Sequence, residues 1–83
     1  MERIEIENKL KQIVAKICPE LDAGQLDVAI PLVEQGLDSL DTLDYVLEVD
    51  DCFGVNIENE DYDNNDLGIV ANMAEYLDNN SVS

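Results

Sequence analysis

The side chain best placed to do chemistry in this chain is Ser39, because its neighbours predict that it stands at the start of a helix. Asp38 is a favourable N-cap residue, since its short carboxylate can accept a hydrogen bond from a free N–H of the first turn. Asp41, three residues on, gives a capping-box-like Asp-x-x-Asp pattern. Ser39 then falls at the first helical position, beside the partial positive charge of the helix end. We therefore predict an exposed hydroxyl in a place that suits a phosphate ester.

The predicted helix carries a row of acids on one face. Asp41, Asp44, Glu48 and Asp51 are spaced three, four and three residues apart, so neighbours on the helix surface are like-charged. Each such pair costs about 0.2–0.5 kcal/mol, and the helix dipole disfavours anions near its end. No lysine or arginine of this helix offsets them. A solvated face is the ordinary interpretation, but a face that is destabilising along its length favours a docking surface for basic partners.

The composition bounds the possible partners. Eighty-three residues predict one domain over residues 1–83, and the net charge of −16 argues against binding to nucleic acid or to an anionic membrane. All four bases lie in the first 16 residues (Arg3, Lys9, Lys11 and Lys16). No apolar run resembles a signal peptide or is long enough to span a bilayer. We expect a cytoplasmic monomer whose partners present basic surfaces.

Metal binding and catalysis find little support. The chain has no histidine, and Cys18 and Cys52 lack metal-type spacing, so we expect no zinc site and two reduced, largely buried cysteines. Residues 60–68 look like a calcium loop, but in the register that begins at Asp63 the twelfth position is Ala74 rather than a bidentate glutamate. A formal metal site is rejected, although loose divalent binding by clustered carboxylates stays open. Without histidine, Ser39 also lacks the usual general base.

Hydrophobic periodicity predicts an all-α fold. The apolar spacing favours helices over residues 3–17, from 39 to 52 or 53, and over 69–78, with a short helix or polar turn over 59–66. Pro19 should close the first helix and Gly54 the second. The many apolar residues of segment 18–37 predict a long ordered loop packed onto the helices. The expected architecture is a small bundle of three main helices plus one short helix.

The sequence Asp-Ser-Leu-Asp-Thr-Leu-Asp at residues 38–44 resembles the prosthetic-group attachment motif of the acyl carrier proteins. The likeness continues through Phe-Gly-Val-Asn-Ile at residues 53–57. It implies that a phosphopantetheinyl transferase, using coenzyme A, links 4′-phosphopantetheine to Ser39. The arm would carry acyl thioesters of fatty acid, polyketide or related lipid biosynthesis to acyl-transfer, ketosynthase or acyl-activating enzymes, and the protein itself would not be an enzyme.

The resemblance also implies roles for two further sets of residues. Partner recognition maps to Asp38, Asp41, Asp44, Glu48 and Asp51. The core and acyl-chain positions are Leu40, Leu43, Val46, Leu47, Phe53, Ile57, Val70, Met73 and Ala74. The chain departs from the family at Leu37, Tyr45 and Glu48, which weakly favours a specialised carrier. The alternatives are an aminoacyl or peptidyl carrier of a dedicated pathway and an acidic module that binds cations or a basic protein.

Overall fold

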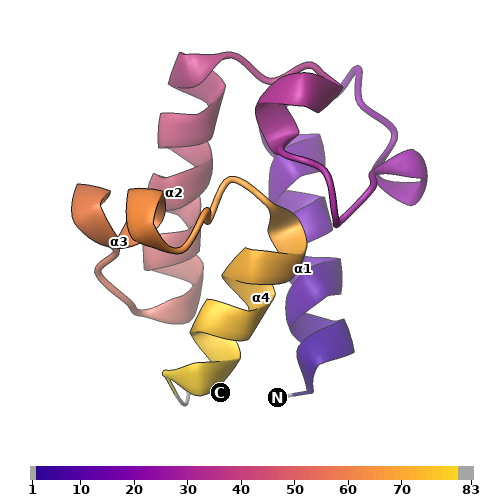
Figure 1. Ribbon diagram of the computed structural model, residues 1–83. Coiled ribbons are helices and arrows are strands. Elements are labelled where there is room, and N and C mark those ends of the chain that lie inside the picture. Colours follow the sequence, from indigo (N-terminus) through magenta and orange to yellow (C-terminus); the bar gives the residue numbers. More distant parts are fainter. Residues whose placement is uncertain (1, 81–83) are drawn as a thin grey trace.

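The computed structural model describes residues 2–80, which form four α-helices and two short 3-10 turns (Figure 1). Within this range there is no strand, so the predicted all-α bundle of three main helices and one short helix is confirmed. No helix of the described range is long and apolar enough to cross a membrane. The elements are α1 (Arg3–Ile17), η1 (Ala23–Gln25), η2 (Leu32–Gln35), α2 (Ser39–Phe53), α3 (Asn59–Asn64) and α4 (Val70–Asn79).

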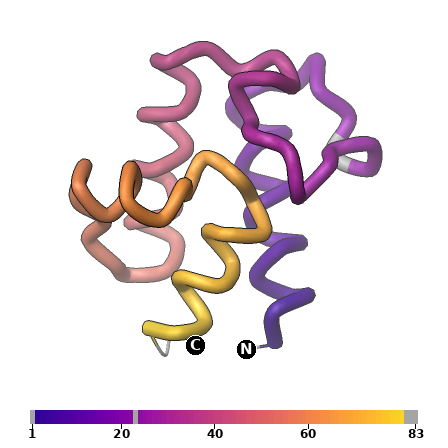
Figure 2. The backbone as a smooth tube through the Cα atoms, in the orientation of Figure 1, coloured from indigo at the N-terminus to yellow at the C-terminus, as the bar shows by residue number. Residues whose placement is uncertain are grey.

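Helix α1 packs against both α4 and α2, which run in the opposite direction along it (Figures 1 and 2). Its inward stripe is the one that the 3.6-residue period predicts, and the buried members are Ile6, Leu10, Ile13 and Val14. The helix ends at Ile17, with Cys18 as its C-cap, directly before Pro19. α1 is therefore the helix around which the bundle is arranged.

The segment between α1 and α2 is an ordered loop, as predicted, and two backbone hydrogen bonds tie it to the α3–α4 region. The Leu32 N–H donates to the Gly68 carbonyl, and the Ala71 N–H donates to the Val28 carbonyl, each at 2.9 Å. Three leucines of the loop are buried in the core: Leu26, Leu32 and Leu37. These contacts hold the loop across one end of the bundle, where α2 begins (Figure 2).

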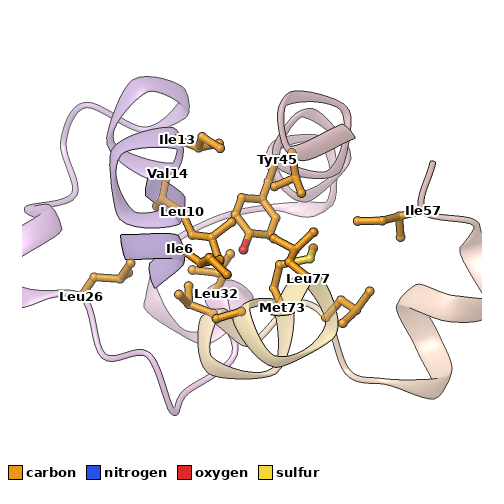
Figure 3. Close-up of a cluster of buried hydrophobic side chains, with 14 of the residues drawn as sticks. Ile6, Leu10, Ile13, Val14, Leu26, Leu32, Tyr45, Ile57, Met73 and Leu77 are labelled. Atoms are coloured by element: carbon orange, nitrogen blue, oxygen red, sulfur yellow. The ribbon is translucent and has the colours of Figure 1, made fainter. Parts of the chain in front are cut away.

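Tyr45 lies at the centre of the core, with its ring between side chains of α1 and α4 (Figure 3). The residue is fully buried, and its hydroxyl has no hydrogen-bond partner among the described residues. Burial, with a smaller contribution from Tyr62, raises the pKa of this hydroxyl far above its usual range, because the core cannot solvate a phenolate. The tyrosine therefore fills space in the core at the cost of an unsatisfied polar atom.

Three of the α2 residues predicted for the core or the acyl chain lie outside the core. Leu40, Leu43 and Leu47 are 69%, 56% and 64% exposed, whereas Tyr45, Val49 and Thr42 are buried. Of the other predicted core positions, Val46 and Phe53 are half-buried, and the buried ones are Ile57, Val70, Met73 and Ala74. The physical reason is that the two sides of the apolar stripe are covered unequally. Helix α1 and the loop cover one side, whereas the other side faces only the six-residue α3, which has no buried residue and leaves that side exposed.

Candidate functional site

The N-terminus of α2 has the predicted capping box. The Asp41 N–H donates to the Asp38 carboxylate at 2.8 Å, and the Asp38 N–H donates to the Asp41 carboxylate at 3.3 Å. Ser39 is the first residue of the helix and is exposed. Its hydroxyl makes no hydrogen bond to any described residue. The side chain is therefore free to react.

A phosphate ester on Ser39 would fit this position. The capping carboxylate of Asp38 takes the N–H of Asp41, which leaves the N–H groups of Ser39 and Leu40 without intrahelical partners. Such free N–H groups at a helix start are suited to phosphate oxygens. The carboxylates of Asp38 and Asp41 partly cancel the positive end of the helix dipole. The free N–H groups therefore favour a phosphate at this position more than the local charge does.

Thr42 was missed by the sequence analysis and supports the same turn. Its buried hydroxyl donates to the Ser39 carbonyl at 2.8 Å. It also lies beside the Tyr62 hydroxyl of α3, where it lowers the tyrosine pKa and partly offsets the larger, raising effect of burial. Thr42 therefore supports the turn that presents Ser39, and it lines the same groove as Tyr62 of α3. The sequence offered one indication, because residues three apart are neighbours on a helix and the Thr42 hydroxyl is therefore within reach of the Ser39 carbonyl.

The five acids predicted to bind partners all lie on α2 or at its N-cap, but they have different roles. Asp38 and Asp41 are engaged in the capping box. Glu48 forms an ion pair with Lys16 of α1, with the Lys16 Nζ at 3.1 Å from a carboxylate oxygen. Asp44 and Asp51 are exposed and make no hydrogen bond or ion pair with any described residue. These two are the acids most available to a partner.

The exposed leucines lie next to the acids on α2. We call Leu40, Leu43, Leu47, Asp44 and Asp51 the outer face of α2. Spacings of three and four residues put its members on adjacent turns of the helix. An apolar row with free carboxylates beside it is suited to a partner that has both apolar and basic side chains.

A groove with a volume of about 370 Å³ lies between α2 and α3. It begins at Thr42, one turn after Ser39, and extends along α2 to Asp50. Its apolar walls are Leu43, Val46, Leu47 and Ile57, four of the residues predicted for the acyl chain. Asp50, the one acid on the apolar side of α2, accepts a hydrogen bond from the Ile57 N–H at 3.0 Å and so fixes the loop that closes the groove.

The other candidate chemistry is weaker. Residues 2–80 contain no group of three or more His, Cys, Asp or Glu side chains that could hold a metal ion. Both cysteines are free thiols, and Cys18 is half-buried. Cys52 is exposed, so the expectation of two largely buried cysteines is wrong for it. Its position on α2 lies beside the α1–α2 groove that Lys16 and Glu48 also line, rather than on the core face.

Comparison with known proteins identifies the family. The family model described as "Phosphopantetheine attachment site" matches residues 8–77. The match runs from within α1 to within α4, and therefore includes the serine turn and the α2–α3 groove. No curated protein and no solved structure matches the chain.

Proposed function

The chain belongs to the phosphopantetheine-attachment family of carrier domains, and we propose that it is an acyl carrier protein whose arm is attached at Ser39. The family match makes 4′-phosphopantetheine the prosthetic group. The observation that carries the choice of residue is the position of Ser39: an exposed, unbonded hydroxyl at the first position of a capped helix.

Attachment requires little from this chain beyond presenting an oxygen. In the transferase reaction the Ser39 oxygen forms a bond to the pantetheine-bearing phosphorus of coenzyme A. The bond from that phosphorus to adenosine 3′,5′-bisphosphate breaks, and the hydroxyl proton passes to a base of the transferase. The capping box keeps Ser39 at the helix end throughout. Once bound, the arm supplies a terminal thiol that holds the cargo as a thioester.

The outer face of α2 supports delivery of the cargo to partner enzymes. Asp44 and Asp51 are free to attract basic side chains, and the neighbouring leucines offer apolar contact. Asp38, Asp41 and Glu48 add to the negative potential, although each already has a partner within the chain. We expect fast association that weakens as salt rises. Phosphopantetheinyl transferase and acyl-handling enzymes with basic surfaces are the proposed partners.

The α2–α3 groove favours an acyl cargo, of the fatty acid or polyketide type, over an aminoacyl cargo. Its walls include three aliphatic side chains of α2 and Ile57, and it begins one turn from Ser39. An aminoacyl group adds a cationic amine, which the aliphatic walls cannot solvate and which would have to reach Asp50 or Glu58, the two acids that also line the groove. We therefore propose acyl transport, with no catalytic step performed by the chain itself.

The test is the intact mass of the protein after incubation with coenzyme A and a phosphopantetheinyl transferase of broad specificity. We expect a gain of one phosphopantetheine. Ser39→Ala should abolish the gain, and Ser81→Ala, at a serine outside the described residues, should retain it. An unchanged mass of the parent protein would support the alternative of an acidic binding module, and a gain in Ser39→Ala would move the attachment site elsewhere.

A further inference from the structure

Tyr62 of α3 lies between two cavities. One is the α2–α3 groove, and the other, with a volume of about 250 Å³, lies between the η2 region and the α3–α4 loop. The second cavity is lined by the apolar residues Leu32, Val33 and Ile69, and Asp63 and Asp66 also line it. Tyr62 is the one residue that lines both. A side chain shared by two cavities is a wall between them.

The Tyr62 hydroxyl lies close to Gly68 and to Thr42. At its hydroxyl end, a Cβ atom built on Gly68 would lie 2.7 Å from the Tyr62 oxygen, so the tyrosine reaches into space that only glycine leaves free. The Thr42 hydroxyl, which is itself bonded to the Ser39 carbonyl, lies beside the same oxygen. The far wall of the second cavity is also fixed, because the Leu32 N–H donates to the Gly68 carbonyl.

The size of each cavity decides what can fit. Pockets that enclose most of a small ligand have volumes of about 300–1,000 Å³, and each cavity here lies near or below the lower end of that range. A short acyl chain can fill the α2–α3 groove alone. The groove follows α2 from Thr42 to Asp50, a length of about 12 Å at 1.5 Å per residue. An acyl chain longer than this needs the second cavity as well, and the Tyr62 ring stands in its path.

We propose that Tyr62 sets the length of acyl chain that this carrier shelters, by closing the α2–α3 groove against the cavity beneath η2. This inference rests on the proposed carrier function. A short acyl chain is then buried completely in the α2–α3 groove, whereas a longer chain leaves part of its length exposed to water. Tyr62 is half-buried and packs against the outside of the core, so replacing it opens the wall while the fully buried side chains stay in place.

The experiment attaches butanoyl or dodecanoyl pantetheine from the corresponding acyl-coenzyme A to ¹⁵N-labelled protein and records amide chemical shifts. Intact mass confirms the loading. In the parent protein, both chains should shift the amides of Val46 and Ile57, and neither should shift those of Leu32 and Val33. In Tyr62→Ala, the dodecanoyl chain should shift all four. Tyr62→Phe, which keeps the ring, should behave as the parent, and so should Tyr76→Ala, which removes a tyrosine that lines neither cavity.

Three results would contradict the proposed role of Tyr62. In the first, the dodecanoyl chain shifts the amides of Leu32 and Val33 in the parent as strongly as those of Val46 and Ile57. In the second, it shifts none of the four amides in Tyr62→Ala. In the third, Tyr62→Phe gives the same shifts as Tyr62→Ala. Any of these in a correctly loaded protein rejects the role of Tyr62 and leaves the carrier function intact. A parent protein that accepts no acyl-pantetheine has no cargo, which rejects both proposals.

Discussion

Lys16 of α1 forms an ion pair with Glu48 of α2, with 3.1 Å between the ammonium nitrogen and a carboxylate oxygen. The pair joins two helices that contact each other along the bundle, and it neutralises one of the acids expected to meet a partner. The lysine side chain is 70% exposed, so water and salt compete with the pair. The pair therefore affects the charge of α2 more than the stability of the fold.

Lys16→Gln should make the carrier a better substrate for the transferase. The change frees Glu48 to attract a basic partner, so we expect transfer at low salt to be roughly two- to threefold faster. The free energy of unfolding should fall by less than about 1 kcal/mol. The measurements are the kcat/KM for phosphopantetheine transfer at several salt concentrations and urea unfolding. Lys11→Gln removes the same charge from the same helix, and an equal rise in that variant would show that only the net charge matters.

Asp44→Lys should slow the same transfer. Asp44 is exposed and unpaired within the described residues, so reversing its charge places a repulsive group on the outer face of α2. We expect kcat/KM to fall by about five- to tenfold at low salt, and the difference to shrink as salt screens it. Glu75→Lys, on α4, is the matched control, and circular dichroism reports the fold. If both variants slow transfer equally, the recognition surface is not on α2.

Tyr45→Phe should stabilise the protein, because the buried Tyr45 hydroxyl has no partner among the described residues. Removing it should raise the free energy of unfolding by about 1 kcal/mol at neutral pH. Burial also holds the Tyr45 pKa above its unfolded value of about 10. The folded state thus retains its proton where the unfolded state loses it, and the stability falls as pH rises above about 10.

Urea unfolding at neutral and alkaline pH tests both parts of the tyrosine prediction. The phenylalanine variant should gain most over the parent above pH 10, since it has no proton to lose at this position. Tyr76→Phe serves as the control, because its hydroxyl is 3.5 Å from the Asp61 carboxylate rather than without a partner. A Tyr45→Phe variant less stable than the parent at neutral pH would indicate that the hydroxyl has a partner such as an ordered water molecule.

Asp38→Ala should weaken α2 at its start. It removes the acceptor of the Asp41 N–H, a cap worth about 0.5–2 kcal/mol. Asp38→Asn keeps a side-chain oxygen at the same place and should lose only a small part of that stability. Urea unfolding distinguishes these outcomes. Equal losses in the two variants would assign the effect to the charge of Asp38 at the helix end, and no loss in either would remove its capping role.

The sequence predicted those features that depend on nearby residues. The capping box at Asp38 and Asp41, the position of Ser39 and the end of α2 at Gly54 all follow from residues within four positions of one another. Gly54 adopts the left-handed conformation, with φ of 68°, that a helix-ending glycine permits. Local hydrogen bonding and backbone preference are sufficient to set these features, so a single sequence contains the information.

Features that depend on how helices face one another could not be predicted in the same way. Helical periodicity identified Leu43 and Leu47 as part of an apolar stripe, but the exposed width of the stripe depends on how far the short α3 extends over it. The Lys16–Glu48 pair joins residues 32 positions apart, and the position of Tyr62 depends on Gly68 and on the path of the η2 region. Each of these requires the relative placement of separate elements.

The three leucines left uncovered on α2 would make a neutral protein of this size prone to self-association. On this chain every copy carries a net charge of −16, and the repulsion between copies opposes contact between their leucines. A basic surface is instead attracted by the same charge and can cover those side chains. The high net charge therefore disfavours self-association through the exposed leucines and favours proteins with basic surfaces as their contacts.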